Sequence, residues 1–332
     1  MNVLVTGGAG YIGSVVSTEL LHAGHCVTIL DSLIKGHRKA VPPGAELVVG
    51  DISDRALVER VLTESRVEAV MHFAAFIEAG ESMKVPETFF RNNTASALSL
   101  LEAMLARGVK RFVFSSTAAL FGDPKRLPIS EDDELAPTNA YGESKLLVER
   151  MLDWFNRIHG LQFAALRYFN AAGATVDVGE DHHPESHLIP LVLQVAMGKR
   201  ANVSLYGTDY PTPDGTCVRD YVHVVDLAAA HLLALDALSA GRPRVVYNLG
   251  NGQGFSVKQV VEVARRVTGH AIPVVEAPRR PGDPATLVAS SERIRRELGW
   301  TPRYPELEAI ISSAWAWHQR NPQGYNDRED RR

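Results

Sequence analysis

The sequence has 332 residues, of which 45% are hydrophobic and 22% charged, and its formal net charge at pH 7 is −4. This composition is typical of a globular protein with more than one domain, and the negative balance excludes a general attraction to nucleic acid or to an anionic membrane surface. Because no apolar run approaches the roughly 18 residues that span a bilayer and the start lacks a secretory pattern, we expect a cytoplasmic protein that binds neither membranes nor nucleic acid.

The first half of the chain alternates short apolar runs with stretches of helical periodicity. Strands that are apolar throughout and alternate with helices lie in parallel sheets covered on both faces. The pattern therefore predicts an α/β fold of the Rossmann type, with a doubly wound parallel sheet. The expected strands are Val3–Thr6, Val27–Leu30, Glu46–Val49, Ala69–Phe73, Arg111–Ser115 and Gln162–Leu166, and the expected helices are Ile12–Ala23, Arg55–Glu64, Thr94–Ala106 and Tyr141–His159.

The alternation breaks after about Asn170, where a polar, loop-like segment follows, and it resumes between Tyr221 and Leu249. We therefore expect two domains. Residues 1–170 with roughly 219–250 form the larger one, and residues 171–218 with 251–332 form a smaller, mixed α/β domain. Further helices are expected at 191–199, 257–268 and 306–319, and the polar residues 321–332 are expected to be frayed.

A glycine-rich turn follows the first expected strand and opens the first expected helix. Gly7 permits the tight turn, Gly10 lets the backbone approach a pyrophosphate, and Gly13 lets the helix pack close to the sheet. The start of the helix, at Tyr11 and Ile12, offers unpaired N–H groups and the positive end of the helix dipole to phosphate. The turn therefore predicts a dinucleotide site.

Acidic residues at the ends of the second and third expected strands extend this site. Asp31 would accept hydrogen bonds from the adenosine ribose and repel a 2′-phosphate, and no arginine directly follows it. NAD is therefore favoured over NADP. Asp51 and Ile52 would meet the adenine, although capping of the next helix is an equally good interpretation of Asp51.

Tyr141 and Lys145 stand four residues apart, so they project from one face of a helix. A phenol with a pKa of roughly 10 is a poor base, but a nearby ammonium and a positively charged nicotinamide ring favour the phenolate. Tyr141 would take a proton from a sugar hydroxyl while the hydride leaves for nicotinamide, and Lys145 would also hold the nicotinamide ribose. Thr117 would share the substrate hydroxyl proton, with the capping of a turn as its alternative role.

These motifs and several later ones run in order over nearly the whole chain. They resemble the extended short-chain dehydrogenase/reductase family and, within it, the group of UDP-glucose 4-epimerases. The early motifs specify only the wider family, whereas the later ones, especially Tyr206–Tyr210 with Val218–Tyr221, are specific to the epimerases. The remaining matching pieces are His72–Ala75, Gly80–Ser82, Asn92–Asn93, Ser115–Thr117, Arg167–Asn170, Tyr247–Gly250 and Arg279–Asp283.

The resemblance implies NAD as the cofactor, a UDP-hexose as the substrate, and interconversion of UDP-glucose and UDP-galactose through a transient 4-keto sugar. It implies that the smaller domain binds the UDP-sugar and that the chain forms a homodimer through the helices at 94–106 and 141–159. The cofactor contacts that it adds are Phe73, Ala74, Ala75, Asn92, Ser115 and Tyr168.

The resemblance also assigns the substrate contacts. Arg219 and Arg280 would grip the diphosphate, since guanidinium forks suit phosphate oxygens, with a surface salt bridge as the alternative for each. Asp283 would reach the uridine ribose, Tyr206 would lie beside the uracil, and Asn170 would bind the sugar nucleotide. The remaining assigned contacts are His187, Leu188 and Leu287.

Three positions depart from the family's pattern. A lysine that often follows the His-Phe-Ala motif is replaced by the stretch Phe76–Glu78, which predicts weaker retention of NAD. His187 stands where the family often has an amide, and it would replace that contact. Leu287 stands where a tyrosine often closes the hexose pocket, which predicts that UDP-N-acetylhexosamines also react.

The histidines at 182, 183 and 187 suggest a metal site, but the sequence has no cysteines or clustered carboxylates beside them. We therefore expect no metal. A nucleotide-sugar 4,6-dehydratase would carry Asp-Glu after Thr117, where this chain has Ala118 and Ala119. A uronate epimerase or decarboxylase stays open, and a non-catalytic NAD sensor would not need Tyr141 and Lys145.

Overall fold

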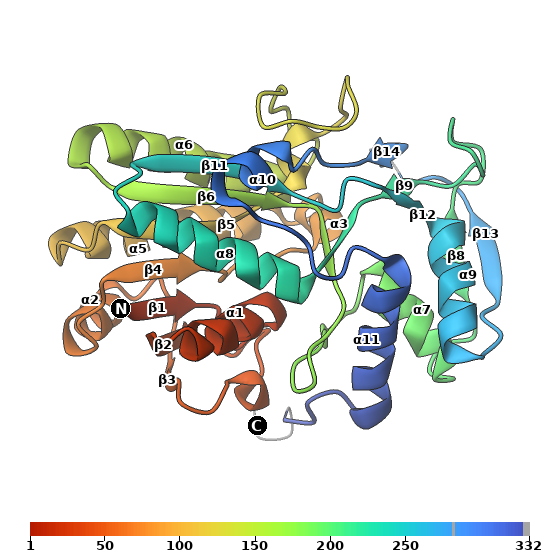
Figure 1. The fold of residues 1–332 in the computed structure, drawn as a ribbon, viewed down its shortest axis with the longest axis horizontal. Coiled ribbons are helices and arrows are strands. Elements are labelled where there is room, and N and C mark those ends of the chain that lie inside the picture. Colours follow the sequence, from red (N-terminus) through yellow and green to blue (C-terminus); the bar gives the residue numbers. More distant parts are fainter. Residues whose placement is uncertain (281–282, 328–332) are drawn as a thin grey trace.

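A parallel sheet lies at the centre of the larger lobe in the computed structural model, which describes residues 1–280 and 283–327 (Figure 1). Among those residues, seven strands pair in the order β11-β6-β5-β4-β1-β2-β3, and every neighbouring pair is parallel. This confirms the doubly wound fold, since the sheet grows in both directions from β1. The strands are β1 (Asn2–Thr6), β2 (Cys26–Asp31), β3 (Glu46–Val49), β4 (Ala69–His72), β5 (Arg111–Thr117), β6 (Gln162–Tyr168) and β11 (Arg244–Leu249).

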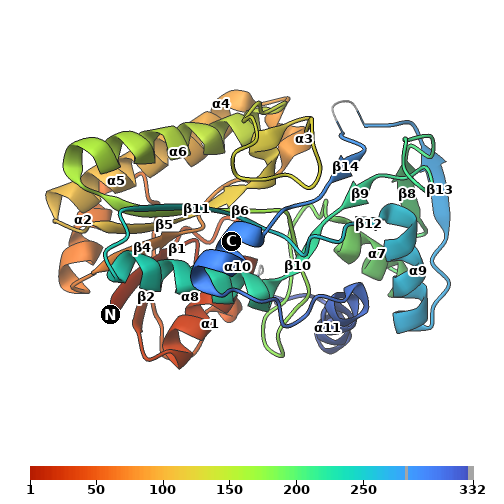
Figure 2. The ribbon, with the colours of Figure 1, turned by 45° about the horizontal axis from the view of Figure 1, so that its top comes forward.

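Helices cover both faces of this sheet (Figure 2). Successive side chains of a strand point to opposite faces, so Val3 and Val5 pack with α1 and α8, while Leu4 packs with α2, α5 and α6. This explains why the strands are apolar throughout. The helices are α1 (Tyr11–His22), α8 (Val224–Ser239), α2 (Arg55–Glu64), α5 (Ser96–Ala106) and α6 (Ala140–His159).

The smaller lobe is built around three helices, α7, α9 and α11, whose apolar faces form one core cluster (Figure 1). In α9 the hydroxyl of Ser256 accepts the N–H of Gln259, while the Gln259 side chain accepts the N–H of Ser256, so a capping box fixes its start. Short strands complete the lobe in the orders β13-β8 and β12-β9-β14. The elements are α7 (Leu188–Ala196), α9 (Val257–Thr268), α11 (Leu307–Arg320), β8 (Val203–Tyr206), β13 (Val274–Ala277), β9 (Val218–Arg219), β12 (Phe255–Ser256) and β14 (Thr286–Leu287).

Short elements link the two lobes and complete the fold. The strands β7 and β10 pair in parallel between the lobes, and the helix α10 packs back on β11 through buried Ile294. A π-helical turn precedes α5, so that helix begins two residues later than expected. These elements are β7 (Asn170–Ala172), β10 (Tyr221–His223), α10 (Glu292–Leu298), α3 (Ala79–Ser82), α4 (Pro86–Phe89), the π-helix (Phe90–Ala95), and two 3₁₀ turns (Arg38–Ala40 and Ala118–Phe121).

The C-terminal residues behave differently from the expected frayed tail. Tyr325 and Asp327 are buried: the ring of Tyr325 stacks on His37 with 4.7 Å between centroids, and Asp327 Oδ1 lies 2.7 Å from His37 Nδ1. The expectation is therefore wrong for residues 321–327, because an aromatic ring and a paired carboxylate anchor this polar segment. Residues 328–332 lie outside the described part of the chain.

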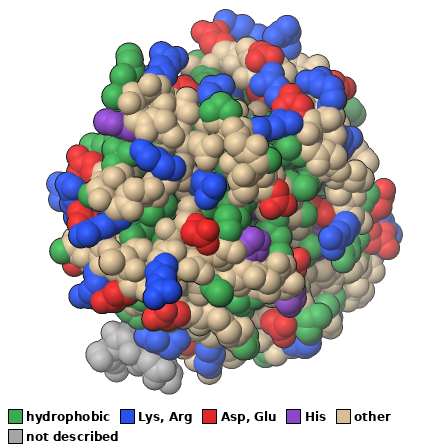
Figure 3. Space-filling model, turned by 60° about the vertical axis from the view of Figure 1, so that its left-hand side comes forward, with side chains coloured by type: hydrophobic (Ala, Val, Ile, Leu, Met, Phe, Trp, Pro, Cys, Tyr) green, Lys and Arg blue, Asp and Glu red, His purple; other side chains and the backbone are tan. Residues whose placement is uncertain are grey.

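The distribution of charged and apolar side chains among the described residues agrees with the expectations from the composition. On the face in Figure 3, basic and acidic side chains are interspersed rather than gathered into one basic patch. The longest helix, α6, has 20 residues but carries charged groups along its length. Among the described residues no helix is long and apolar enough to cross a membrane.

Candidate functional site

The glycine turn between β1 and α1 brings backbone segments closer together than side chains would allow. Gly7 has φ +74°, and a Cβ built on it would lie 2.5 Å from the backbone nitrogen of Ala74. A Cβ on Gly13 would lie 2.3 Å from the carbonyl oxygen of Gly7. Gly10 caps α1 without a side-chain hydrogen bond, so the first N–H groups of the helix remain open to an anion.

A cavity of about 310 Å³ opens at the carboxyl ends of the central strands. It brings together every residue that the sequence assigned to the cofactor. Of the predicted substrate residues, Thr117, Asn170 and His187 line it as well. The cofactor set is Gly7, Gly10, Tyr11, Ile12, Gly13, Asp31, Asp51, Ile52, Phe73, Ala74, Ala75, Asn92, Ser115, Tyr141, Lys145 and Tyr168. The residues present therefore fit an adenine dinucleotide, because phosphate-facing N–H groups and an acidic residue beyond them line one cavity.

The two acidic residues at the adenosine end of the cavity are positioned by backbone N–H groups. Asp31 accepts hydrogen bonds from Ala9 (2.9 Å) and Leu33 (2.8 Å), which fix its carboxylate beside the glycine turn. Asp51 accepts from the N–H of Ser53, while Asp54 caps α2. The alternative role of Asp51 as the cap of that helix is therefore wrong.

A lysine reaches the cavity from a segment that the sequence did not indicate. Lys35, in the loop after β2, places Nζ 2.6 Å from Oε1 of Glu78, and both residues line the cavity. Burial favours the protonated form of Glu78, but the hydrogen bond and charge of Lys35 hold the pKa of its carboxyl below the ordinary value. The stretch Phe76–Glu78 lacks a lysine, yet this cavity contains one. Weaker retention of NAD remains a prediction.

Tyr141 lies in the first turn of α6, where two side chains fix its position. Asn139 caps the helix by accepting the N–H of Gly142 (2.8 Å), and the hydroxyl of Ser82 accepts the N–H of Tyr141 (3.0 Å). The phenol is half-buried, and its pKa is lowered in part by the neighbouring side chain of Thr117. Thr117 also accepts the N–H of Ala119 (3.1 Å), so it caps the turn and contacts Tyr141 at once.

Burial shifts the pKa values of Tyr141 and Lys145 in opposite directions. Burial raises the pKa of Tyr141, the side chain of Thr117 lowers it in part, and Glu78 raises it again. Burial lowers the pKa of the Lys145 amine to about 7. Its Nζ donates to the carbonyl oxygen of Ser115 (3.0 Å). The effects of Lys145 and of the positive nicotinamide ring on the phenolate therefore stay predictions.

The buried amine of Lys145 makes stability depend on pH. Its pKa is about 7 in the folded chain, against an ordinary value of about 10.4 when unfolded. Between these values the unfolded state binds more protons, so the free energy of unfolding rises with pH from about 7 to about 10. We expect Lys145→Met to raise the melting temperature of the NAD-free chain below pH 7, and this gain to shrink as the pH rises toward 10.

Thermal unfolding of both proteins, followed by circular dichroism over a pH series, measures this difference. Subtracting one melting temperature from the other removes the titration of the groups that both proteins share. A gain of the same size at every pH would contradict the shifted pKa of Lys145.

Two further cofactor residues are held by neighbouring side chains. The hydroxyls of Ser115 and Tyr168 are hydrogen-bonded to each other, and burial raises the pKa of Tyr168 above its ordinary value. Asn92 lies in the π-helical turn and donates to Oδ1 of Asn93 (2.9 Å), which also accepts the N–H of Phe76 (2.9 Å). The π-helical turn thus connects the segment after β4 to the wall of the cavity.

The other predicted substrate residues lie outside the lining of the cavity, as two groups and the separate Leu188. The guanidinium of Arg280 lies 3.9 Å from the ring centre of Tyr206, and Arg219 forms an ion pair with Asp283. Leu287 is the register partner of Arg219 and packs on a small apolar cluster that contains Ala118, Phe121 and Phe169. Leu188 opens α7.

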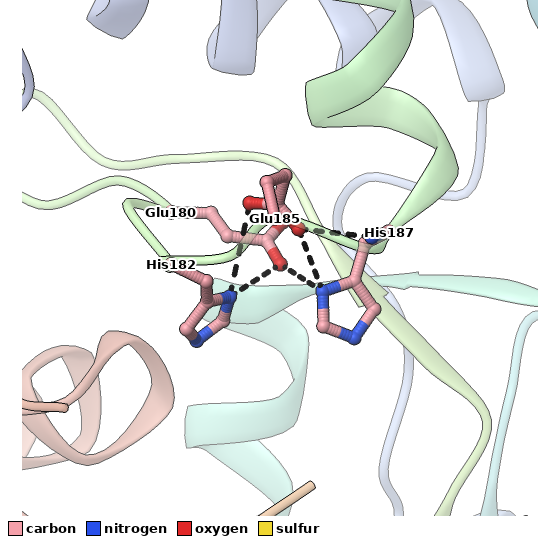
Figure 4. A group of neighbouring side chains, drawn as sticks. All are labelled: Glu180, His182, Glu185 and His187. Atoms are coloured by element: carbon pink, nitrogen blue, oxygen red, sulfur yellow. Dashed lines mark hydrogen bonds and ion pairs between the residues drawn. The ribbon is translucent and has the colours of Figure 1, made fainter. Parts of the chain in front are cut away.

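The loop before α7 contains an arrangement that the sequence analysis missed (Figure 4). Glu180 and Glu185 face His182 and His187, and their ligand-type atoms all lie within 4.8 Å of one another. The premise that no carboxylates cluster near these histidines is therefore wrong. The loop folds so that Glu180 and Glu185 lie against the imidazoles of His182 and His187. Nothing in the local sequence indicates that turn.

Other residues of the cavity wall also escaped the sequence analysis. Part of the wall follows Asp31 directly and consists of Ser32, Ile34, Lys35 and Gly36. Their position after the acidic end of a strand was the feature of the sequence that could have indicated them. Ser82 fixes the backbone of Tyr141, and its only signal was membership of the matching Gly80–Ser82 motif.

Comparisons with known proteins agree with this geometry. Residues 3–250 match the NAD dependent epimerase/dehydratase family. The UDP-glucose 4-epimerase of Lacticaseibacillus casei is 53% identical over 330 residues, which cover 99% of this chain and 100% of that protein. The UDP-glucose 4-epimerase of Bifidobacterium longum, solved with NAD+ and UDP, has a TM-score of 0.92 and 38% identity and covers 98% of this chain and 100% of that one. The UDP-Glc/GlcNAc 4-epimerase of Campylobacter jejuni has a TM-score of 0.84 and 40% identity, with coverage of 96% and 99%.

Proposed function

The chain belongs to the NAD dependent epimerase/dehydratase family, and from that premise we propose how its residues divide the work of a UDP-hexose 4-epimerase. The reaction is the NAD-dependent interconversion of UDP-glucose and UDP-galactose, as in relatives about half identical over their full length. The enzyme is an isomerase. The observation that carries the assignment of roles is that Tyr141, Lys145 and Thr117 line the same cavity as the glycine turn.

Tyr141 and Thr117 handle the proton of the substrate's 4-hydroxyl. Thr117 Oγ1 already accepts a backbone N–H, so its own hydrogen is available to pass between the phenol and the sugar. Bound NAD supplies the acceptor and donor for the hydride at C4. Lys145 holds the nicotinamide ribose, and the wall formed by Phe73, Ala74 and the glycine turn keeps water away from the reacting carbon.

The UDP moiety must stay anchored while the 4-keto sugar turns over, so contacts to the nucleotide should outnumber those to the hexose. We assign the diphosphate to Arg219 and Arg280, whose guanidinium groups suit phosphate oxygens. Arg219 now pairs with Asp283 and Arg280 stacks on Tyr206, which hold both guanidiniums in place for an incoming anion. Asn170, His187 and Leu188 complete the proposed substrate contacts, with NAD bound by residues 1–170 and 219–250 and UDP-sugar by 171–218 and 251–332.

A product assay tests this function against its rival. The purified chain is incubated with UDP-galactose and the nucleotide sugars are separated by chromatography. We expect UDP-glucose as the product. A 4,6-dehydratase would instead lose water and give a 4-keto-6-deoxy sugar, but that chemistry needs an acid and a base where this chain has Ala118 and Ala119.

Leu287 sets the breadth of the sugar pocket. Because leucine is smaller than a tyrosine, we expect UDP-N-acetylglucosamine to be epimerised as well, as the name of the Campylobacter jejuni relative states for that protein. Leu287→Tyr should lower the rate with UDP-N-acetylglucosamine at least about tenfold and leave the rate with UDP-glucose within about twofold, since a pocket change of this size is worth about 1–3 kcal/mol.

Chromatographic assays of both proteins with both substrates measure the two ratios. Val288→Ile, which adds bulk at the next and nearly buried position, controls for general disturbance of β14. No turnover of UDP-N-acetylglucosamine by the parent chain, or an equal loss on both sugars in Leu287→Tyr, would contradict the role of Leu287.

We also propose that the chain assembles as a homodimer through α5 and α6, which lie side by side on one face of the sheet (Figure 2). Trp154 and Ile158 of α6 are 62% and 67% exposed, and Leu98 of α5 is 37% exposed, an apolar surface that a second copy would cover. Sedimentation equilibrium measures this assembly.

We place the protein in the cytoplasm, which the free thiols of Cys26 and Cys217 support.

A further inference from the structure

The loop between β7 and α7 gathers two carboxylates and two imidazoles around one point (Figure 4). Glu180, His182, Glu185 and His187 each offer one ligand atom there, and both histidines turn the same ring nitrogen, Nδ1, toward it. We propose that these four residues, the loop cluster, bind one divalent transition-metal ion, with zinc as the expected occupant.

The chemistry of the four donors points to zinc. Imidazole nitrogen and carboxylate oxygen are both zinc ligands in proteins, whereas magnesium and calcium prefer oxygen alone. The absence of sulfur from the set argues against copper(I) and iron–sulfur clusters. All four ligands come from protein, so the coordination sphere is closed. A closed sphere is typical of a structural ion rather than one that activates substrate.

The spacing of the ligand atoms agrees with a tetrahedral ion. Bonds of about 2.0–2.1 Å place tetrahedral ligands about 3.3 Å apart. His187 Nδ1 lies 2.8 Å from Glu180 Oε1 and 3.1 Å from Glu185 Oε1. His182 Nδ1 lies 3.1 Å from Glu180 Oε1 and 3.9 Å from Glu185 Oε2. These four separations lie on both sides of the tetrahedral value, and all the ligand atoms lie within 4.8 Å of one another, so rotations of the side chains would complete the site.

The two carboxylates of the loop cluster are also buried and supported as the ligands of metal sites are. The side chains of Glu180 and Glu185 are each 6% exposed. The N–H groups of Ser186 (2.8 Å) and His187 (2.9 Å) donate to Oε1 of Glu185, and such outer contacts orient a ligating carboxylate. His187 is the residue directly before α7, so an ion here would tie the loop to the start of that helix.

The position of the loop cluster indicates which properties of the protein the ion would affect. Glu180, His182 and His187 line the cavity that must receive the pyrophosphate of NAD, and the ring of His182 lies edge-on to Tyr11 with 6.4 Å between centroids. Two buried carboxylates at this place would repel an anionic ligand if no cation balanced their charge. A divalent cation neutralises them and fixes the loop as a wall of the site, so it should act on NAD retention and heat stability rather than on the proton transfer.

Metal analysis of the untagged, full-length chain tests the proposal. The protein is loaded with zinc chloride, desalted in metal-free buffer and measured by inductively coupled plasma mass spectrometry. We expect about one zinc per chain in the parent, and at least about a tenfold loss in His182→Ala and in Glu185→Gln. His183→Gln is the matched control, because His183 belongs to the same loop and lies outside the loop cluster, with a side chain 63% exposed.

Two further measurements keep the test decisive if a variant folds poorly. Cobalt(II) substituted into the parent chain should give the strong visible absorption of a tetrahedral N/O site. Stripping zinc with a chelator should lower the parent's melting temperature and release NAD, and added zinc should restore both. Less than about a tenth of a zinc per loaded parent chain, or unchanged zinc in a folded His182→Ala, would overturn the proposal. Protons, not an ion, would then join the carboxylates to the imidazoles.

Discussion

Tyr141→Phe should lower turnover by about two to four orders of magnitude while the purified protein keeps as much NAD as the parent. The reason is that the phenol hydroxyl is the group that exchanges a proton with the substrate, and the hydroxyl of Thr117, which lines the same cavity, cannot replace it as a base. The ring itself stays, so the wall of the cavity is unchanged. Initial rates at saturating UDP-galactose, with NAD content measured after denaturation, give both quantities.

Tyr247→Phe is the matched control for the loss of a buried tyrosine hydroxyl. The phenol of Tyr247 donates to Oε2 of Glu297 (2.9 Å), a contact that serves the sheet and not the cavity. We expect this variant to be less stable and to turn over at close to the parental rate. Near-parental turnover in Tyr141→Phe would contradict the assignment of the base.

Gly7→Ala should remove NAD from the protein and with it the activity. The added Cβ would stand 2.5 Å from the nitrogen and 2.8 Å from the Cα of Ala74, both of which are backbone atoms that cannot rotate away. The turn that presents N–H groups to the pyrophosphate must therefore shift, and a displacement of about 1 Å costs about a hundredfold in rate. Absorbance of bound cofactor and the rate with added NAD measure the two losses.

Gly24→Ala isolates the steric effect in that experiment. Gly24 has φ +81°, close to the φ of Gly7, but a Cβ there would meet nothing within 4 Å. Both variants carry the left-handed strain of about 1–2 kcal/mol, and only Gly7→Ala adds the collision. We expect Gly24→Ala to keep its NAD and its turnover. Equal loss of NAD in both variants would mean that strain alone disturbs the site.

The features that the sequence predicted well are local ones. The glycine turn follows a strand and opens a helix within eight residues, and the spacing of Tyr141 and Lys145 places them on one helix face wherever that helix lies. The central strands were predicted because side chains on both faces are buried, so each reads as an apolar run. These signals depend on neighbours along the chain, which the sequence displays directly.

The features that the sequence could not predict depend on neighbours in space. Lys35 and Glu78 are 43 residues apart, and neither differs in type from an ordinary surface residue. The carboxylates of Glu180 and Glu185 meet the imidazoles through a turn without a helical or strand period. The lowered pKa of Lys145 results from its burial in the folded protein, and no local pattern in the sequence reveals that burial.

The central claim is that bound NAD removes the hydride from C4 and returns the same hydride within one turnover, so the fate of the hydrogen at C4 tests it most directly. The enzyme is incubated with UDP-glucose that carries deuterium at C4, in the presence of excess unlabelled NADH. Mass spectrometry and NMR then locate the label in the UDP-galactose formed. Retention of deuterium at C4 in nearly all of the product is the predicted result. Hydrogen in place of deuterium at C4 would show that the labelled cofactor exchanges for the added NADH during turnover, and it would contradict the claim.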